Sequence, residues 1–273
     1  MHILVGTLYT IENEFKECCR SIEAQTYKNF KHLVIKNLPK QEAHEKLYRT
    51  FMDNADSYNL LIKIDADMVI TDNELFEKVV KKFQNDPELD LLLIAIHDYF
   101  TDDMLIGINI FRNTVRWNLG KEALFTDRTY DPNSIRKKEK DYTEIAPAAM
   151  HCHNPSPFQA FHYGFHRGMK VENKKNYLGG LEPVVAHYQR TRDNHLAYAV
   201  LGANTAFTNK FTVDQISYND ETLLHYFNKR YASLQPSELH RKALYSKIYF
   251  MYQLPAYRML VNKYQAFKKQ VTR

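Results

Sequence analysis

Two aspartates one residue apart, Asp65 and Asp67, are the side chains of this 273-residue chain best suited to chemistry. They follow the apolar run 59–64, and a second short apolar run, 68–70, comes directly after them. A short apolar run that ends on two acids is typical of a buried strand with carboxylates at its C-terminal edge. Open α/β sheets bind their ligands at that edge. Two hard oxygen ligands suit Mg²⁺ or Mn²⁺, which bridge to substrate phosphates, although a strand end followed by a polar turn gives the same pattern.

The residues before this pair predict the elements that would position it. We expect a strand over 2–6, a helix from about Phe15, a strand over 31–35 and a helix over about 40–54, ahead of the strand that ends on the acids. This order of strands and helices is typical of a right-handed, nucleotide-binding half of an α/β sheet.

The middle of the chain predicts more strands and a loop. Residues 89–96 and 105–112 are expected to be strands, and the segment 97–103 between them either forms a hairpin turn, which we favour, or faces the site. The charged stretch 126–141 is expected to be a mobile surface excursion, and loops in such a place often close over a ligand. A further helix is expected to begin with Ser156 as its N-cap and Pro157 as its first residue.

Two segments resemble family 2 glycosyltransferases, which have the GT-A fold. Residues 21–30, Ser-Ile-Glu-Ala-Gln-Thr-Tyr-Lys-Asn-Phe, resemble the S-[LI]-x-x-Q-T-Y-x-[ND]-[FW] stretch of that family. Residues 62–67, Ile-Lys-Ile-Asp-Ala-Asp, resemble its strand and D-x-D motif. The two features in this order are more specific than either alone, and the resemblance extends over the first 70 residues, about a quarter of the chain. The resemblance implies an α/β fold with a GT-A-like nucleotide-binding sheet and helices on both faces. In this chain we expect a helical C-terminal region to follow it.

The resemblance also implies roles for single residues. Asp67 would hold a metal that stabilises the departing diphosphate, and Asp65 would contact the ribose, the metal or a metal-bound water. Thr7 and Tyr9 stand where the family has its P-x-Y-N segment, and we expect them near the nucleotide. GT-A enzymes often complete the metal shell with a later histidine, for which His187 is the preferred candidate, with packing as its alternative.

The chain departs from the family at two places. Lys-Asn at 36–37 replaces the acid pair that reads the nucleotide base, so the sequence assigns no base. Ser-Pro at 156–157 stands where the glutamate–aspartate pair with the catalytic base is expected. His153 and Glu182 are the remaining candidates for that base, and the stereochemical outcome is open.

A histidine-rich segment begins at His151. His151 and His153 alternate across Cys152, so in an extended segment both point to one side. They could belong to a zinc site, but no second ligand pair at a recognised spacing follows. Alternatively, one of them contacts substrate or moves a proton, or both pack in a loop. Arg167 and Lys170 share a face of the following helix, where they would neutralise a diphosphate or end a solvated helix.

Composition fits one enzyme-sized unit. The chain is 44% hydrophobic, has no basic-then-apolar leader at its start, and has no run of about 20 apolar residues. The cysteines Cys18, Cys19 and Cys152 give no disulfide framework, so we expect a reduced, cytoplasmic compartment. A net charge of +5 is too small to indicate nucleic acid as a partner.

The C-terminal residues combine basic and aromatic side chains. Residues 222–273 contain ten lysines or arginines and one acid, Glu238. Basic, aromatic helices suit an anionic membrane surface, and they also suit a helix packed on a core with a solvated basic face. We therefore predict a GT-A-like catalytic domain over 1–215, a helical extension over 216–273, and peripheral contact with the inner face of the membrane.

These observations together predict a glycosyltransferase that depends on Mn²⁺ or Mg²⁺. It would move a sugar from a nucleotide-diphosphate sugar to a glycan or lipid-linked acceptor, in the synthesis of bacterial surface polysaccharide. One alternative is a non-catalytic GT-A-like subunit that binds a nucleotide or glycan. The other is a nucleotidyltransferase, which would need a glycine-rich, lysine-bearing loop at 6–13, where there is one glycine and no lysine.

Overall fold

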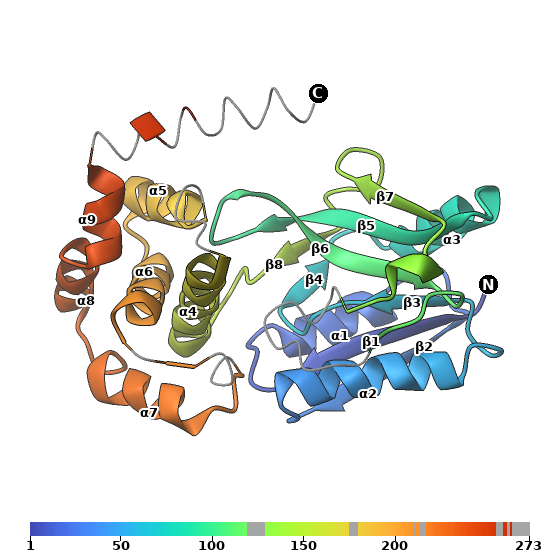
Figure 1. Cartoon of the computed structure of the whole chain (residues 1–273), viewed down its shortest axis with the longest axis horizontal. Coiled ribbons are helices and arrows are strands. Elements are labelled where there is room, and N and C mark those ends of the chain that lie inside the picture. Colours follow the sequence, from blue (N-terminus) through green and yellow to red (C-terminus); the bar gives the residue numbers. More distant parts are fainter. Residues whose placement is uncertain are drawn as a thin grey trace. The chain divides into compact units, whose positions relative to one another are not determined.

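The chain folds as two compact units, traced from blue to red in the computed structural model (Figure 1). The first comprises Met1–Tyr99 and Asp103–Asn154, and the second comprises Phe100–Asp102 and Pro155–Arg273. The contacts thus divide the chain after Asn154, and the expected limit of a catalytic domain at 215 stays a prediction. The structure describes residues 1–118, 129–174, 180–209, 211–212, 217–254, 259–260 and 263.

The first unit opens with the predicted alternation of strands and helices. The central strand of this part pairs in parallel with its two neighbours, and a helix makes each crossover. Parallel pairing requires such crossovers, because a short turn cannot return the chain to the same end of the sheet. The elements are β1 (Ile3–Tyr9), α1 (Phe15–Glu23), β2 (Phe30–Lys36), α2 (Lys40–Asp53) and β3 (Leu60–Lys63).

The sheet then continues with antiparallel and parallel pairs. The strand order is β2-β1-β3-β6-β5-β8-β4, with β7 pairing beside β5. β6 runs antiparallel to both β3 and β5, which makes the sheet mixed. The added elements are β4 (Met68–Ile70), α3 (Leu75–Asn85), β5 (Leu89–Asp98), β6 (Asp103–Arg112), β7 (Lys137–Asp141) and β8 (Ala149–His151).

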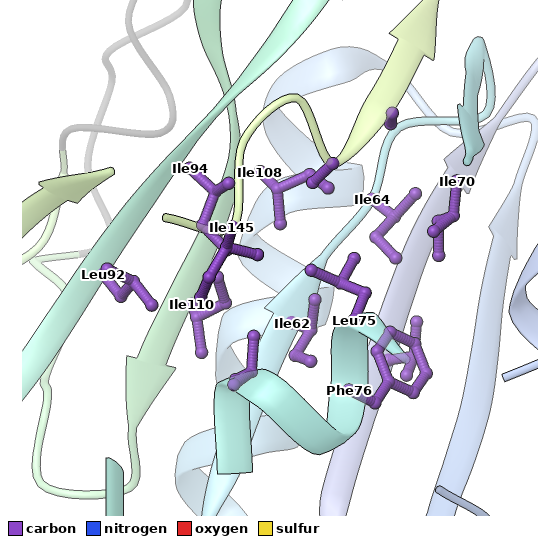
Figure 2. Close-up of a cluster of buried hydrophobic side chains, with 14 of the residues drawn as sticks. Ile62, Ile64, Ile70, Leu75, Phe76, Leu92, Ile94, Ile108, Ile110 and Ile145 are labelled. Atoms are coloured by element: carbon purple, nitrogen blue, oxygen red, sulfur yellow. The ribbon is translucent and has the colours of Figure 1, made fainter. Parts of the chain in front are cut away.

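Helices cover both faces of this sheet, as the sequence predicts. Successive strand residues point to opposite faces, so Leu60 and Ile62 join one buried cluster while Leu61 joins the other. The first cluster includes residues of α1 and α3 and is drawn in Figure 2, where Leu75 and Phe76 of α3 lie against the sheet isoleucines. The second cluster includes residues of α2. Each fully buried side chain of this kind stabilises the fold by about 1.5–3 kcal/mol.

One prediction for this unit is wrong in part. The expected surface excursion at 126–141 contains strand β7, which pairs in parallel with β5; its first residues, 126–128, lie outside the described part of the chain. Charged side chains of this segment form ion pairs within β7 and with α3. Glu139 lies 2.8 Å from Lys137 and 3.3 Å from Lys82 of α3. The run of charges correctly indicated an exposed segment, because most of β7 is exposed, but it did not indicate the backbone pairing with β5.

The segment before β7 is held by a fully buried carboxylate, Asp90. Its Oδ1 accepts hydrogen bonds from Arg136 Nη2 at 2.8 Å and from Thr114 Oγ1 at 2.7 Å, and its Oδ2 accepts one from the Arg136 backbone N–H at 2.8 Å. Burial raises the pKa of Asp90, but these hydrogen bonds outweigh burial and lower the pKa to about 2.

Asp90→Asn is expected to lower the free energy of unfolding by about 1–3 kcal/mol near neutral pH, since hydrogen bonds to a charged group are lost. The folded pKa of Asp90 lies below the unfolded value of about 3.9, so the charge stabilises the fold above that value and loses its effect as pH falls toward about 2. Urea unfolding of both proteins across this range should show the difference shrinking below about pH 4. A difference that stays constant down to the folded pKa would contradict this account.

The second unit, as far as it is described, is helical. Its elements are α4 (Pro157–Lys174), α5 (Glu182–Thr191), α6 (Asn194–Thr208), α7 (Glu221–Arg230), α8 (Pro236–Leu244) and α9 (Lys247–Gln253). Ser156 Oγ accepts a hydrogen bond from the Gln159 N–H at 3.2 Å, which confirms the predicted N-cap of α4. α4 and α6 approach closely at Gly164 and Gly202.

Among the described helices, none combines the length and apolar character that crossing a membrane requires. With its helical C-terminal region, the chain has the predicted mixed α/β fold.

Candidate functional site

The D-x-D motif occupies the turn between β3 and β4. Asp67 comes immediately before β4, and the first residue of β4, Met68, pairs with His151 at the end of β8. The backbone N–H of Cys152 donates to the backbone oxygen of Asp67 at 2.8 Å. The register of β4 and β8 therefore places His151 and Cys152 beside Asp67, although Cys152 is 85 residues away in the sequence.

β8 also pairs with the end of β5, and this fixes the ring of His151. Asp98, the last residue of β5, is the register partner of His151 and is fully buried. Its Oδ1 lies 2.6 Å from His151 Nδ1. A carboxylate on one ring nitrogen holds the tautomer and orientation in which the other nitrogen can bind a metal.

The other ring nitrogen of His151 meets two further atoms of the kind that bind metals. His151 Nε2 lies 3.4 Å from Asp67 Oδ2 and 3.4 Å from Cys152 Sγ. Cys152 Sγ lies 3.4 Å from the same Asp67 oxygen. The three atoms form a triangle of the kind that can hold one metal ion. Asp67 and His151 each keep 14% of their side-chain surface exposed, so solvent reaches the cluster.

The charges in the cluster depend on one another. Burial raises the pKa of Asp67, but the adjacent His151 outweighs burial and lowers it. Burial lowers the pKa of His151, but its negative neighbours raise it well above the ordinary value. Burial raises the pKa of the Cys152 thiol well above its ordinary value. The pairing of Asp67 with His151 thus favours the charged form of both side chains. Asp67 Oδ1 is buried and has no hydrogen-bond partner among the described residues.

Two more carboxylates come from the loop after β1. Burial, followed by the charge of Asp67, raises the pKa of Glu12 to about 7. Its Oε2 accepts a hydrogen bond from the Thr10 N–H at 2.7 Å. Glu14 is 1% exposed and accepts a hydrogen bond from the Asn154 N–H at 3.0 Å. The site is therefore rich in negative charge, which favours a bound cation.

Sequence reasoning missed Glu12 and Glu14, and it placed Asp98 in a segment for which a turn was favoured over the site. A signal was present for each, because acids that follow β1 or end β5 belong to strand ends of the same sheet as the D-x-D motif. The pairing of His151 with Asp67 had no such signal, because it depends on the register of β8.

Asp65, the first acid of the motif, has a different environment. Its Oδ1 lies 2.6 Å from the Nζ of Lys63, which is 2% exposed, whereas the Asp65 side chain is 35% exposed. The lysine of its own strand thus neutralises Asp65, and the described metal-ligand cluster does not include it. A role for Asp65 at the ribose or the metal stays a prediction.

The other predicted site residues of the first unit make contacts outside the Asp67–His151–Cys152 cluster. Thr7 is fully buried, and its hydroxyl lies 3.0 Å from His32 Nε2. Tyr9 stacks on Phe15 with ring centroids 3.8 Å apart. His153 Nε2 lies 3.1 Å from a carboxylate oxygen of Glu17, and its Nδ1 is buried without a partner in the described part of the chain. Their functional roles stay predictions.

Four predicted residues belong to the second unit. Arg167 on α4 donates a hydrogen bond to the Tyr163 hydroxyl at 2.8 Å, and Lys170 on the same helix is half-buried. Glu182 is the first residue of α5. His187 Nδ1 lies 3.4 Å from the backbone oxygen of Phe100, a contact that the packing interpretation also explains. Their roles at a diphosphate, as catalytic base and at a metal stay predictions.

Comparison with known proteins identifies no family. No family model matches the chain, and no curated protein matches it. Among solved structures it is similar to A197 from STIV, with 13% identity and a TM-score of 0.32, over 41% of this chain and 65% of that one. It thus spans just under two thirds of the length of A197.

Two similar structures are glycosyltransferases. One is the catalytic domain of Drosophila beta1,4-galactosyltransferase 7 in complex with xylobiose, with 13% identity and a TM-score of 0.36, over 56% of this chain and 72% of that one. The other is a glycosyltransferase involved in the glycosylation of the major capsid of PBCV-1, with 14% identity and a TM-score of 0.36, over 57% of this chain and 95% of that one. Membership of family 2 stays a prediction.

Proposed function

We propose that this chain is a glycosyltransferase that uses a nucleotide-diphosphate sugar and a divalent cation held by Asp67 and His151. One observation carries the proposal. The second acid of the D-x-D motif, in the turn after buried strand β3, lies 3.4 Å from a histidine whose other nitrogen is bonded to buried Asp98. A carboxylate and an oriented imidazole at a sheet edge suit a cation that faces the phosphates of a ligand.

The residues present fit such a cation. Asp67 Oδ1 has no partner among the described residues, and the Asp98 hydrogen bond leaves His151 Nε2 as the coordinating atom. When bound, the cation would neutralise charge that develops on the departing diphosphate. Asp67 and His151 would position it, and Asp98 would keep the ring in place. Glu12, with a pKa of about 7, can exchange a proton near neutral pH.

The catalytic base and the acceptor of the sugar transfer remain predictions from the sequence. His153 and Glu182 remain the predicted catalytic bases, and a glycan or lipid-linked acceptor of bacterial surface polysaccharide remains the predicted acceptor. One observation favours the alternative of a non-catalytic nucleotide-binding or glycan-binding subunit. Lys63 neutralises Asp65, so the first acid of the motif already has a cationic partner.

A thermal-shift panel of nucleoside diphosphates, with and without Mn²⁺, Mg²⁺ or Zn²⁺, tests the proposal, followed by an assay for nucleoside diphosphate released from nucleotide sugars. We expect at least one nucleotide to raise the melting temperature only when a cation is present, because ligands that bind the folded state stabilise it. Release of that nucleotide from its sugar conjugate supports a transferase. Binding without release under all acceptor conditions supports the non-catalytic subunit, and no binding to any nucleotide overturns both.

The C-terminal helices support the predicted membrane contact. Large apolar side chains are exposed in and after α8 and α9, at Tyr245 (85%), Phe250 (65%), Leu254 (42%), Met259 (53%) and Leu260 (50%). Basic residues Arg241, Lys242 and Lys247 belong to the same helices. Apolar and basic side chains together favour adsorption to an anionic surface.

The full-length chain is therefore expected to co-sediment with anionic vesicles at low salt and to be released at high salt, since each basic residue contributes about 1 kcal/mol that salt screens. The double variant Tyr245→Ser and Phe250→Ser should bind several-fold more weakly, because both side chains are exposed and their loss spares the core. Vesicles of neutral lipid are the control. Equal sedimentation with neutral and anionic vesicles, or none with either, would refute an electrostatic membrane contact.

A further inference from the structure

We propose that Asp67, His151 and Cys152 form a three-ligand site selective for Zn²⁺, with the sulfur of Cys152 as the third ligand. This inference concerns the same site as the proposed function and names the ion that it holds. It differs from the prediction drawn from the sequence, which is Mn²⁺ or Mg²⁺ with His187 as the third protein ligand.

The spacing of the three atoms fits a tetrahedral zinc centre. Nitrogen, oxygen and sulfur ligands lie about 2.0–2.3 Å from zinc, so in a tetrahedron they lie about 3.3–3.6 Å from one another. Each side of the triangle between Asp67 Oδ2, His151 Nε2 and Cys152 Sγ is 3.4 Å. Neighbouring oxygens around octahedral Mg²⁺, at about 2.1 Å from the ion, lie only about 3.0 Å apart. Three protein ligands leave the fourth tetrahedral position for water or substrate.

Cys152 reaches this position through an unfavourable backbone conformation. Cys152 has a φ of 51°, in the left-handed region that residues other than glycine rarely adopt. Such conformations persist where the surrounding structure requires them, and they concentrate at functional sites. Here the Cys152 N–H donates to the backbone oxygen of Asp67 at 2.8 Å, and the side chain is buried with its sulfur against the other two ligand atoms.

His151 also has the hydrogen-bond partner that a metal-binding histidine needs. Fully buried Asp98 fixes the ring through Nδ1, in the carboxylate–histidine arrangement that supports zinc ligands. Asp67 Oδ1 adds a buried oxygen without a partner in the described residues.

The sulfur of Cys152 favours Zn²⁺ over the other candidate ions. Thiolate ligands favour zinc and other softer ions, whereas Mn²⁺ and Mg²⁺ favour carboxylate, carbonyl and water oxygens. As the sulfur binds the ion, the thiol proton leaves to solvent. We therefore expect the site to bind Zn²⁺ at least about 100-fold more tightly than Mn²⁺, in the direction of the general order of affinities.

The test uses full-length protein treated with a chelator, and it needs no sugar donor. Zn²⁺ and Mn²⁺ affinities are measured by competition with a chromophoric chelator, and Co²⁺ reports sulfur ligation through its thiolate charge-transfer absorption. We expect one ion per chain and a charge-transfer band in the wild type. Cys152→Ser should lose the band and bind Zn²⁺ about 100-fold more weakly, whereas Cys19→Ser, a half-buried cysteine on α1, should keep both.

Asp98→Asn gives a second measurement that keeps the sulfur. It should keep the Co²⁺ band but weaken Zn²⁺ binding by about 10–100-fold, the usual effect of losing an outer-shell carboxylate. Circular dichroism identifies any variant that fails to fold. A Co²⁺ band that survives in Cys152→Ser, or wild-type protein that binds Mn²⁺ as tightly as Zn²⁺, would overturn the zinc site. Because the readout is metal binding, a chain that binds Zn²⁺ without any transferase activity refutes only the proposed function.

Discussion

Asp67→Ala is expected to lower kcat/KM for the cleavage of a nucleotide sugar by about 10³-fold or more, while the fold survives. A bound cation supplies several kcal/mol of charge stabilisation to a departing diphosphate, and each 1.4 kcal/mol is about a tenfold change in rate. The variant removes the carboxylate that contacts both His151 and Cys152. Steady-state release of nucleoside diphosphate measures the effect, and thermal unfolding checks the fold.

Asp56→Ala is the matched control, because Asp56 is an exposed acid between α2 and β3 and contacts none of the cluster. It should keep wild-type kinetics and cation affinity. An Asp67→Ala enzyme with wild-type kcat/KM would show that the D-x-D motif holds no catalytic ion in this chain.

The same assay separates the two candidate histidines. The resemblance to GT-A enzymes implies a later histidine as a metal ligand, for which the sequence favoured His187, and the structure places His151 beside Asp67. His151→Ala should abolish the cation dependence of nucleotide binding, whereas His187→Ala should leave it unchanged if that side chain only packs against the Phe100 carbonyl. The reverse result would restore the ligand set that the resemblance implies.

The sequence predicted the parts of the fold that depend on local pattern. The β1-α1-β2-α2-β3 segment has clear apolar periodicity and short connections, so its order and approximate limits could be assigned. The position of Asp67 at a sheet edge followed from the same pattern. The contact between Lys63 and Asp65 could have been inferred too, because residues two apart in an extended strand point to the same side.

The rest of the site depends on pairing between distant strands. β8 is only three residues long, and its place between β5 and β4 sets which residues meet Asp67. A shift of one residue in that register would turn the His151 side chain to the other face of the sheet. No spacing in the sequence fixes this register, so the sequence could suggest a histidine ligand but could not distinguish His151 from His187.

The largest expected effect on stability comes from the second unit, at the close approach of α4 and α6. A Cβ atom on Gly202 of α6 would lie 1.9 Å from the backbone oxygen of Phe161 and 2.9 Å from the backbone nitrogen of Phe165, both on α4. Backbone atoms cannot move away as a flexible side chain can, so the two helices would have to separate. Overpacking of this kind costs about 1–3 kcal/mol and occasionally more.

Gly202→Ala is therefore expected to lower the free energy of unfolding by about 2 kcal/mol or more, measured by urea denaturation. Intrinsic helix propensity predicts the opposite sign, because alanine is favoured over glycine by about 1 kcal/mol inside a helix. Gly168→Ala, in the same pair of helices, is the comparison. Its Cβ would first meet the methyl group of Ala206 at 2.8 Å and a backbone oxygen at 3.0 Å, so the clash is milder and propensity offsets more of it. If Gly202→Ala were as stable as the wild type or more so, helix propensity would outweigh packing, and the close contact between α4 and α6 would not exist in solution.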